Sequence, residues 1–346
     1  MIEKNTIHYI LEKFGLDHHN FDVIPHGSGL IHQTYVVKEN LIPTYILQRV
    51  NDTVFLNPED IAYNLKFIGS FLQNKNPEFL FTLPLSTIAN ENYAMVDSNY
   101  YRMFHYVKDS HTISVCKTAD QAFEAAKAFG SFTNELSGLP LEHLKETIPQ
   151  FHNLNYRFQS FLQALKSGNS QKIDDSKNLI DWFFLHENVV KKFKAILDDE
   201  KFKLRVTHHD TKISNVLFDR SNKSICVIDL DTVMQGYFIS DVGDMIRTYT
   251  SEADEEEKDL DKIYFRKNFF EAIKAGYLEN MKDLLSASEL DSFAYAGKFM
   301  IYMQALRFFT DYINDDIYYG AKYPTHNLVR AKNQIRLFEL LNIDYQ

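Results

Sequence analysis

The stretch V-T-H-H-D-T-K-I-S-N-V-L-F, residues 206–218, and the shorter I-C-V-I-D-L-D, residues 225–231, decide how this chain is interpreted. Both join apolar and β-branched runs to polar turns, which predicts short strands at 204–207, 216–218 and 225–230. Phosphoryl transfer requires a carboxylate beside the attacking hydroxyl, metal ligands that bridge the phosphates, and a cation near the transferred group. The two stretches contain residues of all three kinds.

Five side chains in these stretches are the candidates for that chemistry. We expect Asp210 to accept a hydrogen bond from the substrate hydroxyl and Lys212 to neutralise the migrating phosphoryl group. Asn215 offers an amide oxygen to Mg²⁺, and Asp229, at the end of the last apolar run, offers a carboxylate. Asp231 lies two residues on and is a further candidate for the metal. The alternative is that Asp and Asn merely form turns with their own backbone, but this does not account for the whole set.

Composition limits the other classes of function. The 346 residues are 45% hydrophobic, which is enough for sizeable cores in two domains or one bilobal unit. The net charge of −10 argues against general affinity for nucleic acid or anionic membrane. Two cysteines, Cys116 and Cys226, are too few for a disulfide framework and favour a reducing compartment. The charged, amphipathic start of the sequence does not resemble a signal peptide, so we expect a cytoplasmic protein.

The pattern along the chain changes from strand-like to helical. Residues 1–105 predict a small antiparallel sheet with a helix at 59–72, and residues 108–346 predict a mainly helical part with a long helix at 293–313. The fold class is therefore α+β. The expected strands lie at residues 21–25, 34–37, 45–50, 93–96 and 100–105.

The spacing H-x-D-x-x-x-x-N, followed by a strand that ends in Asp, resembles the catalytic and metal loops of the protein-kinase-like superfamily. The forms H-H-D-T-K-I-S-N and I-D-L-D resemble the aminoglycoside phosphotransferase and choline kinase branch, and within it the N-acetylhexosamine 1-kinases. The closer match is carried by I-H-Q-T-Y (31–35), Y-I-L-Q-R-V-N-D-T-V-F (45–55) and A-L-R-F-F-T-D-Y (305–312). The resemblance implies a bilobal fold, with a nucleotide-binding lobe at 1–105 and a helical catalytic and acceptor-binding lobe at 108–346. It also implies ATP and Mg²⁺ as cofactors.

Two further residues near the catalytic stretch are expected to support it. By resemblance, Asp241 in I-S-D-V-G-D accepts hydrogen bonds from backbone N–H groups of the catalytic loop, although an acidic residue is favoured at a helix N-terminus in any case. His208 is expected to orient the same loop. Asp244 has less claim to a role.

The nucleotide is expected in the first lobe. Gly27 and Gly29 in H-G-S-G-L-I-H would let backbone N–H groups approach phosphates, or they simply form a turn. Arg49 is the expected phosphate-binding cation, similar to that of choline kinases, with Glu59 either its partner or a helix cap. The segment 103–107 is the expected hinge beside adenine. Phe104 and Tyr106 are its candidate side chains, with ordinary core packing as the alternative.

The acceptor is expected in the helical part. Arg307 interrupts an apolar helix, so its charge is either paired with Asp311 or faces the acceptor. Tyr318, Tyr319 and His32 are weaker candidates for contact with a sugar.

An arginine in the acceptor site would repel a polyamine, which favours a neutral sugar and transfer to an N-acetylhexosamine (GlcNAc or GalNAc), giving its 1-phosphate. Kinases of aminoglycosides, choline or homoserine, and a non-catalytic pseudokinase, are the alternatives. The acidic run at 251–261 is expected to be a solvated loop or helix start, although it would also suit a cationic acceptor. We find no A-P-E element after Asp229, which disfavours a protein kinase.

Overall fold

The computed structural model describes residues 2–27 and 32–345, which form two compact units that alternate along the chain. The first unit contains residues 1–111, 138–149 and 228–234, and the second contains residues 112–137, 150–227 and 235–346. The change of pattern along the sequence predicts a single boundary at 105–108, and no local pattern marks the return of residues 138–149 and 228–234 to the first unit. In the part of the chain that is described, no helix is both long and apolar enough to cross a lipid bilayer.

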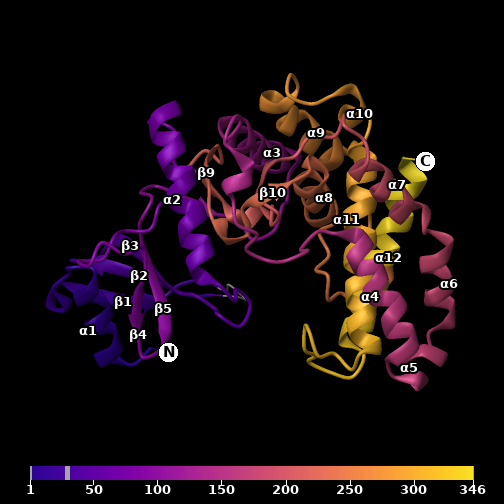
Figure 1. Cartoon of the computed structure of the whole chain (residues 1–346), viewed down its shortest axis with the longest axis horizontal. Helices are drawn as coiled ribbons and strands as arrows, with labels where there is room; N and C mark the ends of the chain where they lie inside the picture. The colour runs from indigo at the N-terminus through magenta and orange to yellow at the C-terminus, as the bar shows by residue number, and fades with distance from the viewer. Residues whose placement is uncertain (1, 28–31, 346) are drawn as a thin grey trace. The chain divides into compact units, whose positions relative to one another are not determined.

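The first unit is built on an antiparallel sheet (Figure 1). Its strand order is β1-β2-β3-β5-β4. The hairpins β2–β3 and β4–β5 turn through pairs of residues with positive φ, Asn40–Leu41 and Asp97–Ser98, as tight two-residue connections require. The elements are α1 (Lys4–Lys13), η1 (His18–Asn20), β1 (Phe21–Pro25), β2 (Gln33–Glu39), β3 (Ile42–Arg49), α2 (Pro58–Lys75), β4 (Ala94–Val96), β5 (Asn99–His105), η2 (Leu141–His143) and η4 (Leu230–Thr232).

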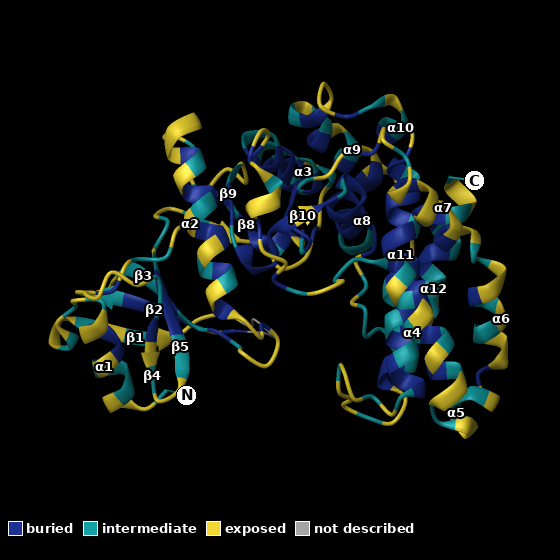
Figure 2. Ribbon diagram, viewed as in Figure 1, coloured by how far each residue is buried: buried dark blue, intermediate teal, exposed yellow. Residues whose placement is uncertain are grey.

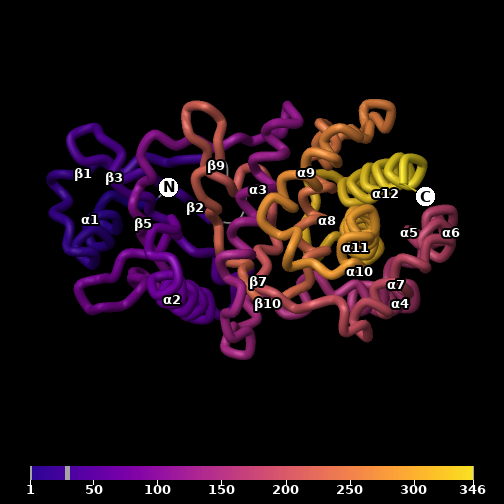
Figure 3. Tube along the Cα trace, turned by 90° about the horizontal axis from the view of Figure 1, so that it is seen from above, coloured from indigo at the N-terminus to yellow at the C-terminus, as the bar shows by residue number. Residues whose placement is uncertain are grey.

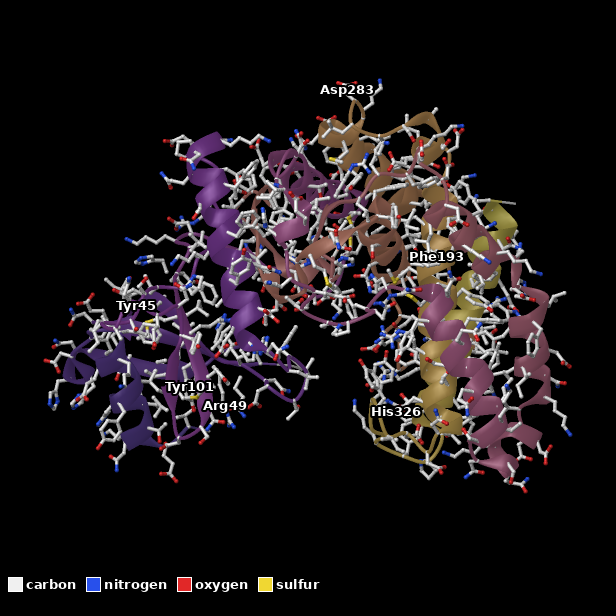
Figure 4. The ribbon with its side chains drawn as sticks, viewed as in Figure 1. Tyr45, Arg49, Tyr101, Phe193, Asp283 and His326 are labelled. Carbon is white, nitrogen blue, oxygen red and sulfur yellow. The ribbon has the colours of Figure 1, made fainter. Side chains whose placement is uncertain are left out.

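Helix α1 covers one face of this sheet. Ile10 and Leu11 pack with Leu47 and Tyr101 in a buried core. Because side chains alternate along a strand, Arg49 shares this face with Leu47. The Arg49 guanidinium donates to the Asn99 side chain, and Tyr101 is the cross-strand partner of Arg49. Arg49 and Tyr101 are labelled in Figure 4.

A buried asparagine on α2 attaches the two returning segments. The Nδ2 group of Asn64 donates to the carbonyls of Lys145 and Val233, and its Oδ1 accepts from the Lys145 N–H at 2.8 Å. Asn64 is almost wholly buried, so losing either partner would leave a polar group unpaired.

The second unit is mainly helical, and α11 lies at its centre (Figure 2). This helix is buried along most of its length and packs against α8 and α12, with α12 alongside it in Figure 3. The helices are α3 (Ala119–Glu135), α4 (Leu154–Ser167), α5 (Ser170–Asp174), α6 (Lys177–Leu185), α7 (Asn188–Leu197), α8 (Phe238–Tyr249), α9 (Lys267–Met281), α10 (Ala287–Leu290), α11 (Phe293–Ile313) and α12 (His326–Asp344). The short elements are β7 (Arg205–Thr207), η3 (Ile213–Asn215), β8 (Val216–Phe218), β9 (Ser224–Val227) and η5 (Leu260–Lys262), while β6 (His111–Thr112) and β10 (Met234–Gly236) lie where the chain passes between units.

Two of the sequence expectations were wrong in detail. The last short strand, β9, ends at Val227 rather than continuing to Leu230. Asp229 instead has the left-handed backbone that Asp tolerates better than most residues. The acidic run at 251–261 is a loop but is not simply solvated, because Glu255 forms ion pairs with Arg247 of α8 and Arg330 of α12, and Glu256 forms one with Lys322. Arg247 is only eight positions from Glu255, whereas Arg330 and Lys322 lie far away in sequence and gave no local signal.

Candidate active site

The loop between β7 and β8, residues 207–215, is held by the first turn of α8. Both oxygens of Asp241 accept backbone N–H groups, from His208 at 2.9 Å and from His209 at 2.7 Å. His209 has a φ of 66°, an uncommon conformation for a residue with a side chain, so this anchoring helps to fix the loop. Burial raises the pKa of Asp241 to about 6, and the two N–H groups oppose that rise.

Asp210 lies at the centre of the loop and is bonded from both sides. Lys212 Nζ lies 3.1 Å from its Oδ1, while Asn215 Nδ2 donates to its Oδ2 at 3.1 Å and to its carbonyl at 2.9 Å. Burial alone would raise the pKa of Asp210, but the Lys212 cation and these hydrogen bonds hold it below the usual value. Asp210 is therefore an ionised carboxylate at neutral pH, which can only accept hydrogen bonds.

His208 and His209 play different parts in the loop. The ring of His208 is buried with its edge against Phe129, and its Nδ1 accepts from the Asp210 N–H at 3.3 Å. His209 contacts Thr207 Oγ1 at 2.7 Å and Ser240 Oγ at 2.9 Å, and burial lowers its pKa to about 3. A neutral imidazole in a closed network positions the backbone rather than transferring protons.

Through Ser240 this network reaches His152, which is not among the residues expected in the site. His152 Nδ1 is hydrogen-bonded to Ser240 Oγ and lies 3.4 Å from His209 Nδ1. Burial lowers the pKa of His152, as do the nearby charges, including Arg307 and Arg157. His152 thus connects the 207–215 loop to a group of arginine and aromatic side chains.

That group, here called the arginine–aromatic surface, is formed by Phe151, Arg157, Gln304, Arg307, Tyr318 and Tyr319. The Arg307 guanidinium lies 5.5 Å from the ring centres of Phe151 and Tyr319, and donates to Gln304 Oε1 at 3.3 Å. Arg157 donates to the Phe151 carbonyl at 3.2 Å. Tyr318, largely exposed, lies 5.9 Å from the Arg307 guanidinium.

Arg307 is not paired with Asp311. The Asp311 carboxylate accepts the N–H groups of Tyr318 and Tyr319 and the amide of Asn327. Among the described residues, neither Arg307 nor Arg157 has a carboxylate oxygen within 4.0 Å of its guanidinium nitrogens. Within the same part of the chain, the Nε of Arg157 is buried without a hydrogen-bond partner. Within the described chain, Arg307 and Arg157 are therefore two cations without a carboxylate partner on one surface, and the pKa of Arg157 is lowered by burial and then by the charge of Arg307.

In the first unit, Asp231 is held by Arg102, which is not among the residues expected in the site. Arg102 donates to both carboxylate oxygens of Asp231, and to Gln48 Oε1 through Nε and Nη2. Since Gln48 is the cross-strand partner of Arg102, both project from the sheet face opposite Arg49. A buried charge in the apolar run Y-Y-R-M-F was the available signal, because such a charge needs a partner.

His32 adds a hydrogen bond to the Asp231 carboxylate. Its Nδ1 accepts the Asn51 N–H at 3.1 Å, so its Nε2 carries the proton and donates to Asp231 Oδ2 at 2.7 Å. Burial would raise the pKa of Asp231, but Arg102 and His32 hold it well below its usual range. Asp229 is exposed, and one of its oxygens lies within 4.8 Å of ligand atoms of His32 and Asp231.

These contacts show which of the predicted Mg²⁺ ligands has an oxygen that is still available to a cation. Mg²⁺ prefers carboxylate and amide oxygens, and Asp229 offers the former. Asn215 uses its amide nitrogen within the loop, which leaves its oxygen as the group for a cation. Asp231 fits less readily, because both its oxygens already accept hydrogen bonds from Arg102. The metal-binding role of Asp231 stays a prediction that competes with this ion pair.

The remaining nucleotide candidates lie around the first unit's sheet. Gly27 has a φ of 75°, while Gly29 lies outside the described residues. Phe104 lies 5.3 Å from the Arg102 guanidinium, and the N–H of Tyr106 donates to Thr44 within the sheet. Arg49 binds Asn99, and Glu59 accepts from the Tyr93 hydroxyl rather than pairing with Arg49.

Solved structures share this architecture. An aminoglycoside phosphotransferase from Alicyclobacillus acidocaldarius is 13% identical, with a TM-score of 0.63 over 99% of this chain and 96% of that one. A spectinomycin phosphotransferase in complex with ADP and spectinomycin is 12% identical, with a TM-score of 0.63 over 99% and 98%. A choline kinase from Cryptosporidium parvum is 14% identical, with a TM-score of 0.61 over 99% and 97%.

At identities this low, the structural similarity shows the fold alone. It is the protein-kinase-like fold of these enzymes. The family follows from the sequence itself, because the model of the phosphotransferase enzyme family matches residues 22–283, well over half of the chain. The chain therefore belongs to the phosphotransferase enzyme family, whose aminoglycoside phosphotransferase and choline kinase members transfer phosphoryl groups to small alcohols.

Proposed function

We propose that this protein uses ATP and Mg²⁺ to phosphorylate an N-acetylhexosamine at its anomeric hydroxyl, giving the sugar 1-phosphate. The observation that carries the choice of acceptor is the arginine–aromatic surface, where Arg307 and Arg157 have no carboxylate partner among the described residues. Guanidinium groups donate hydrogen bonds and accept none, so they suit hydroxyl and carbonyl oxygens. Tyrosine and phenylalanine rings suit the apolar faces of a sugar ring.

The same surface disfavours cationic acceptors. Choline and aminoglycosides carry positive charge, and two unpaired guanidiniums would repel them. A carboxylate-bearing alcohol such as homoserine is the second candidate, because its carboxylate could form a bidentate pair with either arginine.

In this proposal the residues of each unit have separate tasks. Asp210 accepts the hydrogen bond of the acceptor hydroxyl and Lys212 neutralises the transferred phosphoryl group, while Asp241 and His208 hold their loop. Bound Mg²⁺ would neutralise phosphate charge, with the oxygens of Asn215 and Asp229 as its protein ligands. The nucleotide is proposed for the first unit, as ADP is bound by the spectinomycin phosphotransferase that shares the fold.

The test is coupled ADP release over a panel of N-acetylglucosamine, N-acetylgalactosamine, homoserine, choline and aminoglycosides. We expect turnover with an N-acetylhexosamine and loss of the reducing end in the product, as the anomeric hydroxyl is consumed. Turnover of choline or an aminoglycoside alone would overturn the sugar assignment. Turnover of homoserine alone would replace it with the second candidate.

A further inference from the structure

The acidic segment at residues 254–257 is fixed against α12. The side chain of Asn333 donates to the carbonyls of Asp254 and Glu257 at 3.0 and 3.3 Å. Glu256 points to the exposed Lys322, at 2.7 Å. Its neighbour Glu255 is directed to a different set of partners.

Glu255 bridges two arginines that come from different helices. Arg247 of α8 donates to its Oε2 at 3.2 Å, and Arg330 of α12 donates to its Oε1. The arginine side chains are 10% and 13% exposed, so these are partly desolvated, charge-assisted bonds. Burial would raise the pKa of Glu255, but the two guanidiniums lower it, and the group stays ionised at neutral pH.

On one side, the bridge leads to the backbone next to Asp210. Asp244 Oδ1 accepts from Arg247 Nε and Nη2 at 3.1 and 2.9 Å. The other oxygen, Oδ2, accepts the N–H of Thr211 at 2.9 Å. Thr211 lies between Asp210 and Lys212 in the sequence, so this hydrogen bond holds the backbone from which both side chains project.

On the other side, the bridge leads to the arginine–aromatic surface. The Arg330 guanidinium lies 3.7 Å from the ring centre of Phe308 and 5.1 Å from that of Tyr319. Tyr319 in turn lies 5.5 Å from the Arg307 guanidinium. Four charges of alternating sign, Asp244, Arg247, Glu255 and Arg330, therefore connect the 207–215 loop to this surface and sum to zero.

We propose that Glu255 is a positioning residue, which holds the 207–215 loop that carries Asp210 and the Tyr319 side of the arginine–aromatic surface in their working geometry. Without its charge, Arg247 and Arg330 would repel one another and only Asp244 would remain to neutralise them. Thr211 and Tyr319 would then lose their common support. The inference rests on phosphoryl transfer by Asp210, which is part of the proposed function, but not on the identity of the acceptor.

The test compares Glu255→Gln with Glu256→Gln, a matched loss of one charge from the adjacent residue. ADP release is followed with the panel acceptor that the wild type uses best. For Glu255→Gln we expect kcat about tenfold lower and the acceptor KM several-fold higher, with the ATP KM within twofold of wild type. For Glu256→Gln all three constants should stay within twofold. Glu255→Asp, which keeps the charge, should recover part of the lost kcat.

The role of Glu255 is decided by the following outcomes. Equal losses in the two Gln variants, or an unchanged kcat in Glu255→Gln, would overturn the inference. If Glu255→Gln does not fold, Arg330→Lys replaces it, since Lys keeps the charge but not the planar stacking on Phe308 and Tyr319. A raised acceptor KM in Arg330→Lys supports the inference and an unchanged one refutes it. Failure of the proposed sugar function would show separately, in the wild-type acceptor panel.

Discussion

Arg102 and Asp231 form a bidentate ion pair that is almost wholly buried, although 129 positions separate them in the sequence. Breaking such a pair from one side leaves an uncompensated charge in a poorly solvated place, which typically costs about 3–5 kcal/mol. The relationship provides a direct test of what stabilises the first unit.

We expect Arg102→Met to lower the free energy of unfolding by about 3 kcal/mol at pH 7. Urea denaturation measures this. Arg49→Met is the matched control on the opposite face of the same sheet, and should cost less than about 1 kcal/mol because the Arg49 contact to Asn99 is partly exposed. Equal costs in the two variants would mean that the ion pair adds nothing beyond packing of the arginine stem.

Asp210→Asn should fold normally and reduce kcat by about 10²- to 10⁴-fold, the range typical of positioned acid–base groups. The amide keeps the size of the carboxylate but cannot take up the acceptor's proton. ADP release gives kcat, and thermal unfolding checks the fold. A kcat within about threefold of wild type would exclude Asp210 as the base.

Arg307→Met should lower kcat/KM for the acceptor by about 10- to 100-fold, since hydrogen bonds to charged groups contribute about 1.5–3 kcal/mol. The KM for ATP should not change by more than about twofold. Lys177→Met removes an exposed cation from α6 and serves as the control. If the two variants behave alike, the arginine–aromatic surface does not bind the acceptor.

The pKa of Asp241, raised to about 6 by burial, has a consequence for stability. A carboxyl whose folded pKa exceeds its usual value of 3.8 binds its proton more tightly in the folded state, so its contribution to stability falls as pH rises from about 4 to about 6. Two pH units correspond to at most about 3 kcal/mol. His208 and His209 face this carboxyl with their backbone N–H groups, and Asp244 lies on the same helix.

The measurement is the stability difference between wild type and Asp241→Asn over that pH range, because other carboxyls, such as Asp231, have lowered pKa values and act in the opposite direction. We expect the difference to decrease as pH rises. An increase would show instead that the N–H groups of His208 and His209 dominate the titration of Asp241.

The local parts of the fold could be predicted from sequence because they depend on local patterns. The helix expected at 293–313 is α11 as the structure has it, and strand β1 has the expected bounds of 21–25. The return of residues 228–234 to the first unit could not be predicted. It depends on Asn64 and Arg102, whose partners lie far away along the chain.

The same division holds for the candidate site. Asp210, Lys212 and Asn215 lie within six residues of one another, so their spacing was informative, and the structure places them in contact. Arg102 was missed although it interrupts the apolar run Y-Y-R-M-F, whereas nothing adjacent in sequence distinguishes Arg157 and Glu255 from surface charges. Arg49 was expected to bind phosphate by resemblance to choline kinases, and this stays a prediction; the face of the sheet on which it lies follows from its buried neighbour Leu47.

The discontinuous first unit also constrains how the protein is made. During synthesis, residues 1–111 emerge early, but Asp231 follows only after more than one hundred further residues have been added. Until then Arg102 lacks its counter-charge and Asn64 lacks Val233. The sheet therefore cannot reach its final state on the ribosome before much of the helical unit has been translated, although domains commonly fold in order from the N-terminus.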